Sequence, residues 1–175
     1  MSTKNTLRAV AFALLVGASA SANAANPATA TFQVLITILK ACTVTAGTAS
    51  NINLGSVAAT ATNTANSNTI SVNCSKTTPY YVGLSPSNAN TAGAGVMAST
   101  TAPATNTDKV PYQLNSTSGA SGTIWGNTAT STAVGNGVAG TGTGLAQTLT
   151  VYAVAASANF TPDSYADTVT VNVNY

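Results

Sequence analysis

The sequence offers few side chains that could perform chemistry. Its 175 residues include no histidine and no glutamate. The commonest general base is therefore missing, and so is a paired-carboxylate mechanism that uses Glu. Asp163 and Asp167 are close in sequence, but they lie beside a proline and at the start of an expected strand, where Asp typically forms turns. We predict that the chain is not an enzyme and that it binds no metal and no cofactor.

One glycine pattern matches a nucleotide-binding motif by its letters alone. Residues 135–140 read GNGVAG, which fits G-x-G-x-x-G. That motif binds phosphates only between a strand and a helix whose N-terminus faces them. The segment that follows, LAQTLTVYAVA, has the pattern of a strand, so we interpret these glycines as loop residues.

Cys42 and Cys74 are the only cysteines, and the N-terminal segment predicts their redox environment. Residues 1–24 have Lys4 and Arg8 in front, a short apolar run and a small-residue ending, which is the layout of a secretory signal. The apolar run is too short to span a bilayer, and cleavage is expected after residue 24 or 25. In an oxidising compartment the two cysteines are expected to form one disulfide rather than a catalytic or metal-binding site.

Export also changes the net charge of the protein. The formal charge of the whole sequence is +2, but Lys4 and Arg8 leave with the signal, and the remaining three lysines and three aspartates cancel. Nucleic acid and anionic membranes then lose their electrostatic attraction, because phosphate binding needs clustered Lys and Arg. A surface so poor in charge is expected to associate with other protein surfaces. We predict self-assembly, with no nucleic acid partner and no membrane insertion.

The elements that must position these residues are almost all strands. Runs rich in Val, Ile, Thr and Tyr alternate with stretches of Thr, Ser, Asn, Gly and Pro, a pattern typical of a β-sandwich. Residues 88–108 have few apolar side chains and are predicted to form an exposed loop. Beyond the opening run, the expected strands are NINLGSV (51–57), NTISVNCS (68–75), YYVGLSP (80–86), KVPYQLNS (109–116), TIWGN (123–127), LAQTLTVYAVA (145–155) and YADTVTVNVNY (165–175).

The opening run of the expected mature chain, TATFQVLITILKACTV, carries an apolar stripe. Every second residue from position 30 is apolar, while the residues between them are mixed. Alternation of this kind indicates a β-strand with one side fully buried. The stripe consists of Ala30, Phe32, Val34, Ile36 and Ile38.

The last run of the sequence alternates in the same way, with Val169, Val171, Val173 and Tyr175 on one face. An immunoglobulin-like sandwich normally continues with one more strand that pairs with this one, and the sequence ends without it. The apolar stripe of another molecule could supply that strand by adding to the sheet edge. It could equally fold back as an ordinary first strand of its own domain, and the pattern alone fits both interpretations.

Several blocks resemble the spore coat protein U-like domain, which forms the major subunits of archaic chaperone-usher pili. These blocks are FQVLITILKACTV near the mature N-terminus, YQLNSTSGASGTIWGN in the middle, and GTGTGLAQTLTVYAVA followed by SYADTVTVNVNY at the end. They follow the family's order over nearly the whole mature chain. The resemblance implies an all-β fold, an incomplete immunoglobulin-like β-sandwich completed by a donor strand from a neighbouring subunit. One segment, SANFTPDSYADT, departs from the more Gly- and Pro-rich turn expected there.

The resemblance also implies a division of the chain and a set of site residues. Residues 1–24 would be the signal peptide, 25–38 the N-terminal donor strand segment and 39–175 the incomplete immunoglobulin-like pilin domain. Cys42 and Cys74 match the family's disulfide. The donor face would be Ala30, Phe32, Val34, Ile36 and Ile38, and the acceptor edge would be Val169, Val171, Val173 and Tyr175.

The implied function is that of a structural major pilin, which polymerises by donor-strand exchange into an extracellular fibre for adhesion and biofilm formation. Its implied partners are identical subunits, a periplasmic chaperone, an outer-membrane usher and a tip adhesin subunit, and its implied route leads through the periplasm to a cell-surface pilus. The alternative is a secreted monomeric carbohydrate-binding module or adhesin, in which Trp125 and the tyrosines stack on a sugar. Aromatic residues in a sandwich more often pack in the core.

Overall fold

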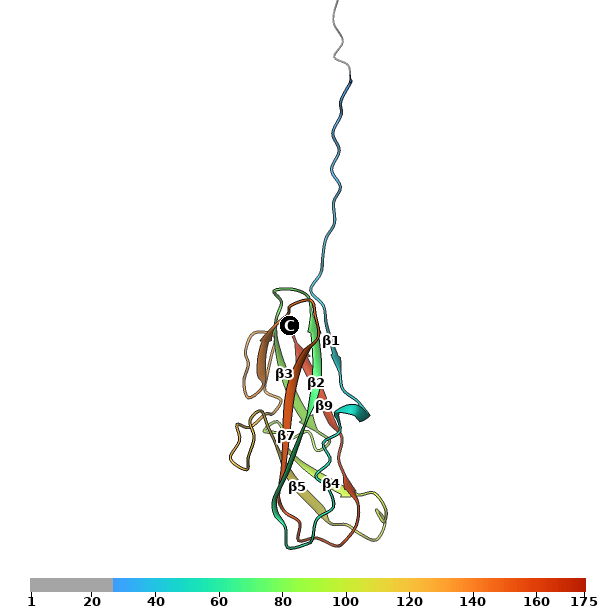
Figure 1. The fold of residues 1–175 in the computed structure, drawn as a ribbon, viewed down its shortest axis with the longest axis vertical. Helices are drawn as coiled ribbons and strands as arrows, with labels where there is room; N and C mark the ends of the chain where they lie inside the picture. The colour runs from blue at the N-terminus through green and yellow to red at the C-terminus, as the bar shows by residue number, and fades with distance from the viewer. Residues whose placement is uncertain (1–26) are drawn as a thin grey trace, which may run out of the picture. The chain divides into compact units, whose positions relative to one another are not determined.

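The computed structural model describes residues 27–175, which form strands and a single short helical turn, η1 (Thr48–Ser50) (Figure 1). The predicted signal peptide lies outside these residues. Among the described residues, none of the helical structure is long and apolar enough to cross a membrane. The chain divides into an N-terminal unit that ends at Thr37 and a domain that runs from Ile38 to Tyr175.

The described part of the N-terminal unit contains no strand. Its apolar side chains are open to solvent: Phe32 is 88% exposed, Val34 87% and Ile36 85%. The strand expected from the opening run is present only from Cys42 onward, where β1 (Cys42–Thr45) begins. The alternating stripe is therefore an extended segment whose apolar face is unburied.

The domain contains two antiparallel sheets, so the predicted all-β, immunoglobulin-like fold is confirmed. The larger sheet has the strand order β1-β2-β7-β5-β4-β8 and the smaller one β6-β3-β9. The bounds are β2 Thr62–Cys74, β3 Pro79–Pro86, β4 Ala94–Ser99, β5 Lys109–Asn115, β6 Val138–Thr141, β7 Gln147–Ser157, β8 Tyr165–Ala166 and β9 Val169–Asn174.

The core is built from alternate residues of the long strands. Side chains in a strand point to opposite faces with a period of two, so one face of each strand is apolar and buried. The buried cluster contains Ile70, Val72 and Cys74 of β2, Tyr80, Val82 and Leu84 of β3, Tyr112 and Leu114 of β5, Val151 and Ala153 of β7, and Trp125.

The prediction of an exposed loop at 88–108 is wrong, because β4 runs through this segment and pairs with β5. Despite its low apolar content, the segment contains a strand that is buried at Gly95 and Ser99 and partly buried elsewhere. Gly95 lies opposite Tyr112 in the register, and an added Cβ there would overlap the tyrosine ring. The large side chain of one strand thus covers the bare backbone of the other.

Three smaller expectations also differ from the structure. Residues 51–57 form no strand, and the segment TIWGN contributes only one isolated bridge, between Ile124 and Asn115. Gly140 is not a loop residue, because it lies within β6 opposite Tyr80. As with Gly95, the partner's aromatic ring fills the space beside the glycine.

Candidate functional site: a groove beside an open strand edge

Strand β9 lies at the edge of the smaller sheet. It pairs with β3 from Val169 to Asn174, and within the described chain no strand pairs with its other side. An edge of this kind presents unpaired N–H and C=O groups to which another strand can bind. Val169, Val171 and Val173 of the predicted acceptor edge are half-buried against the core, whereas Tyr175 follows the last residue of β9 and is about half exposed.

A cavity of 660 Å³, which we call the β9 groove, lies along this edge. Val169 and Val171 line one side of it, and Ile52 and Leu54 line the other. Its apolar floor is part of the core cluster or packs against it, so the groove opens directly into the interior of the sandwich. The floor residues are Ile70, Leu84, Met97, Tyr112, Leu114, Val151 and Ala153.

The groove continues past the N-terminal end of β9. A second cavity of 540 Å³ shares Met97, Tyr165, Ile52 and Leu54 with the first and extends to Phe160. Because the two cavities share these residues, they form one continuous channel.

The wall opposite β9 consists of residues 46–57, which we call the strap. β1 ends at Thr45, and the strap follows it with only the short turn η1 inside. Ile52 and Leu54 alternate along the strap and pack against the core cluster. These two residues are the partly buried apolar positions of the predicted strand 51–57, whereas Val57 is half exposed, and the backbone between Ile52 and Leu54 has no strand partner in the described chain.

Tyr112 and Asp167, two of the polar residues that line the groove, are hydrogen-bonded to each other. The Tyr112 hydroxyl donates a hydrogen bond of 2.7 Å to Asp167 Oδ2. Burial, followed by the neighbouring Asp167 carboxylate, raises the pKa of Tyr112, so its hydroxyl stays protonated and remains a donor. Asp167 Oδ1 accepts the backbone N–H of Thr168 at 2.8 Å, and this bond fixes the turn that leads into β9.

Asp163, the other candidate for chemistry, is held in a hydrogen-bond network at the end of the second cavity. The Ser99 hydroxyl and the Asn106 amide donate to Asp163 Oδ2, and Asn106 also donates to the Tyr165 hydroxyl at 2.8 Å. These donors hold the pKa of Asp163 at about 2. The network ties the loop after β4 to the segment before β8. Within residues 27–175, no three side chains among His, Cys, Asp and Glu are grouped so as to hold a metal ion.

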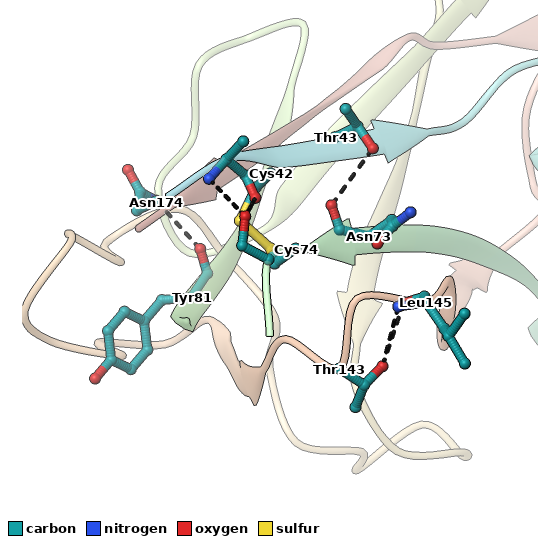
Figure 2. The surroundings of a disulfide bond; sticks show 10 residues. Cys42, Thr43, Asn73, Cys74, Tyr81, Thr143, Leu145 and Asn174 are labelled. Carbon is teal, nitrogen blue, oxygen red and sulfur yellow. Dashed lines mark hydrogen bonds between the residues drawn. A yellow bond between two sulfur atoms is a disulfide. The ribbon is translucent and has the colours of Figure 1, made fainter. Parts of the chain in front are cut away.

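The predicted disulfide between Cys42 and Cys74 is confirmed. The two residues are register partners in the β1–β2 pair, with an S–S distance of 2.01 Å and a Cα–Cα distance of 4.0 Å. Figure 2 shows the bridge beside the hydrogen bond from the Thr43 hydroxyl to the Asn73 carbonyl, which joins the same two strands. The disulfide joins the start of the domain to the end of its longest strand, β2.

The aromatic residues do not form a sugar-stacking platform around Trp125. Its indole is 1% exposed and its Nε1 donates to the Val82 carbonyl at 2.8 Å, so both faces of the ring are covered by the core. Tyr80 and Tyr112 are also buried. These residues pack the sandwich, as is usual for aromatic side chains in such folds.

Sequence reasoning found both cysteines and the edge strand but missed the strap that forms the opposite wall. It also missed Asn66 and Asn68, whose amides donate hydrogen bonds to the strap backbone. The available signal was the Asn-rich composition of residues 63–68, which resembles that of a loop.

Comparison with known proteins places this geometry in a family. The family model of the Spore Coat Protein U domain matches residues 28–172. No curated protein matches the chain. Among solved structures, the fold is similar to a chain in the CsuC–CsuE chaperone–tip adhesion subunit pre-assembly complex from archaic chaperone-usher Csu pili of Acinetobacter baumannii. The TM-score is 0.50 and the identity 22%; the match covers 79% of this chain and 40% of that chain. The family match spans both the described N-terminal segment and nearly the whole domain, and the chain therefore belongs to the Spore Coat Protein U domain family.

Proposed function

We propose that the chain is a pilus subunit whose β9 groove accepts the N-terminal segment of another copy. The observation that carries this proposal is an open strand edge beside a groove whose floor is the hydrophobic core. An extended segment bound there gains backbone hydrogen bonds from β9 and inserts every second side chain into the core.

The apolar stripe has the properties that such a groove requires. Phe32, Val34, Ile36 and Ile38 are all strongly exposed in the single chain, and they recur with the period of a strand. Full burial of each is worth roughly 1.5–3 kcal/mol. Nine residues from Ala30 to Ile38 span about 30 Å as a strand, compared with about 20 Å for β9. The continuation of the groove into the second cavity supports a donor of that length.

We extend the proposal to a major subunit of a homopolymeric fibre. Donor stripe and acceptor groove lie on one chain, so identical copies can add head to tail without closing. The proposed route is export to the periplasm, capture by a chaperone that covers the groove, and secretion through an outer-membrane usher behind a tip adhesin. The product is a cell-surface pilus that serves adhesion and biofilm formation.

The decisive experiment compares the two faces of the N-terminal segment. Val34→Asp and Ile36→Asp place an unpaired carboxylate in the neighbour's core, which is strongly unfavourable. Gln33→Asp and Thr37→Asp make the same chemical change on the opposite face of the strand and serve as matched controls. In cells that express the whole export operon, electron microscopy should show fibres with the control variants and none with Val34→Asp or Ile36→Asp.

The Val34→Asp and Ile36→Asp subunits should still reach the periplasm, form the disulfide and bind the chaperone. Normal fibres from the Ile36→Asp chain would refute the donor role. An unmutated chain that remains a stable monomer in these cells would instead favour the secreted carbohydrate-binding module or adhesin.

A further inference from the structure

The domain has a second open strand edge besides that of β9. Strand β2 pairs with β7 from Thr62 to Val72, but β1 pairs with β2 only from Ser71 to Cys74. In the described chain, residues 62–70 therefore have a strand neighbour on one side only. An incoming strand that seeks backbone partners could bind to either edge.

Two backbone donors of the β2 edge, those of Ser67 and Thr69, are already satisfied by side chains. Ser75 N–H donates to the Ala41 carbonyl at 2.9 Å on the β1 side, and alternate residues of an antiparallel strand direct their N–H groups the same way. Ser67 and Thr69 therefore point their N–H groups toward the side that β1 has left. These groups donate to Oδ1 of Asn66 and Asn68, both at 2.8 Å. The preceding asparagines thus occupy the edge in place of a strand.

The same two amides hold the strap. Because each Oδ1 accepts from the backbone, each Nδ2 is directed outward as a donor. Asn66 Nδ2 donates to the Asn53 carbonyl at 2.7 Å, and Asn68 Nδ2 donates to the carbonyls of Ala49 at 2.9 Å and Asn51 at 2.8 Å. In the described chain, no backbone–backbone hydrogen bond joins residues 47–57 to a strand. The wall opposite β9 is therefore held by side-chain amides and by the packing of Ile52 and Leu54.

We propose that Asn66 and Asn68 are positioning residues of the acceptor groove. They occupy two backbone donors of the open β2 edge and keep the strap opposite β9, so an incoming strand pairs with β9 and is enclosed on its other side by the strap. This inference rests on the proposed function of the groove.

The test uses the full mature chain with Ile36→Asp, which keeps the groove but cannot donate its own stripe. This chain is refolded with a fluorescent synthetic peptide of residues 27–38, and release of the peptide is followed after addition of excess unlabelled peptide. Asn68→Asp and, separately, Asn66→Asp are then introduced. Aspartate has the shape of asparagine and can still accept the backbone N–H, but an ionised carboxylate cannot donate to the strap. Asn73→Asp makes the same charge change on the opposite face of the same strand and is the control.

Asn68→Asp removes two donated hydrogen bonds and should speed peptide release about tenfold, and Asn66→Asp removes one and should speed it roughly threefold. Asn73→Asp should leave the rate unchanged. Without peptide, amide hydrogen exchange in Asn68→Asp should accelerate in residues 49–55 and not in β3 or β7, which separates a loosened strap from general destabilisation.

Equal release rates from the Asn66→Asp, Asn68→Asp and Asn73→Asp chains would overturn the inference and leave the proposed function intact. If Asn68→Asp fails to fold, the milder Asn66→Asp variant decides the result against the same control. If the Ile36→Asp chain takes up no peptide at all, the proposed function fails, and the positioning role fails with it.

Discussion

Gly140 and Gly95 show how single residues of this core depend on partners that are distant in sequence. Gly140 lies opposite Tyr80 in the β6–β3 pair, and Gly95 lies opposite Tyr112 in the β4–β5 pair. Each tyrosine ring covers the backbone of its glycine closely enough that an added Cβ would overlap it. Glycine is therefore required at both positions because the ring of the facing tyrosine leaves no room for a side chain.

This arrangement predicts a large effect of one methyl group. Gly140→Ala should lower the free energy of unfolding by about 1–3 kcal/mol, because the buried Tyr80 ring must move off its site. Gly47→Ala is a control, since a Cβ at that position would meet no atom within 4 Å. Urea denaturation of the two variants checks this, and equal midpoints would contradict the packing argument.

Asp163 predicts a dependence of stability on pH. Its pKa in the folded protein is about 2, below the ordinary value of 3.8, because Ser99 and Asn106 donate to the carboxylate. The unfolded chain therefore binds the proton first as the pH falls. The stability that this group contributes is complete above about pH 4 and is lost as the pH drops toward about 2.

Asp163→Asn removes this titration, so the melting temperature of the variant should fall less steeply than that of the wild type between about pH 4 and pH 2. Thermal unfolding followed by circular dichroism at several pH values in this range provides the measurement. A residual slope is expected, because the backbone N–H of Thr161 also lowers the pKa of Asp108. Identical slopes in both proteins would show that the network around Asp163 is not formed.

At the scale of the elements, the strands with regular alternation of β-branched and aromatic residues could be predicted from the sequence. β3 and β5 begin and end within one residue of the predicted segments, and β7 within two. In these strands the side chains that form the core are also the ones that produce the alternation of apolar and polar residues along the sequence. Local sequence and tertiary packing therefore favour the same structure.

The missed elements are those whose burial or bonding comes from elsewhere in the chain. β4 and β6 contain glycines that are covered by tyrosines of other strands, so their own composition resembles a loop. The strap has the alternating pattern of a strand, and Ile52 and Leu54 pack inward. It forms no strand because no strand of the described chain lies beside it to pair with its backbone. The position of the strap is determined by the hydrogen bonds from Asn66 and Asn68 together with the packing of Ile52 and Leu54.

The disulfide should be important because β1 is short. β1 pairs over four residues with β2 and with no other strand of the described chain, and the bridge closes a separation of 32 residues. The double variant Cys42→Ala, Cys74→Ala should lose roughly 3–4 kcal/mol of unfolding free energy in guanidinium denaturation. An unchanged denaturation midpoint would contradict the predicted stabilisation by the disulfide.

Alkylation of the wild-type protein under denaturing, non-reducing conditions should label no thiol, as a check that the bridge is formed.

At the scale of the whole molecule, groove and stripe predict that one chain can be made self-sufficient. A copy of residues 26–38 fused after Tyr175 through a flexible linker should fill the β9 groove in cis. The product should be a soluble monomer by size-exclusion chromatography and should melt at a higher temperature than the unfused chain, because the groove floor is no longer open to solvent.

The control for this fusion carries Val34→Asp and Ile36→Asp in the appended copy only. It should resemble the unfused chain in size and melting temperature. A control that is stabilised as strongly as the first fusion would mean that the added tail acts in some other way than by filling the groove.

The position of the disulfide also determines how the domain would carry mechanical load. In a fibre built by the proposed mechanism, tension on a subunit arrives along the backbone of its N-terminal segment. It passes Ala41, which is hydrogen-bonded to Ser75, and then reaches the disulfide at Cys42 (Figure 2). Without the bridge, that tension would act on the hydrogen bonds between Ala41 and Ser75 and on the four residue pairs of β1. With the bridge, the force crosses to Cys74 and enters the 13-residue strand β2, which β7 supports along most of its length. The crosslink thus acts as a mechanical anchor that transmits tension past the short strand β1 to the middle of the larger sheet.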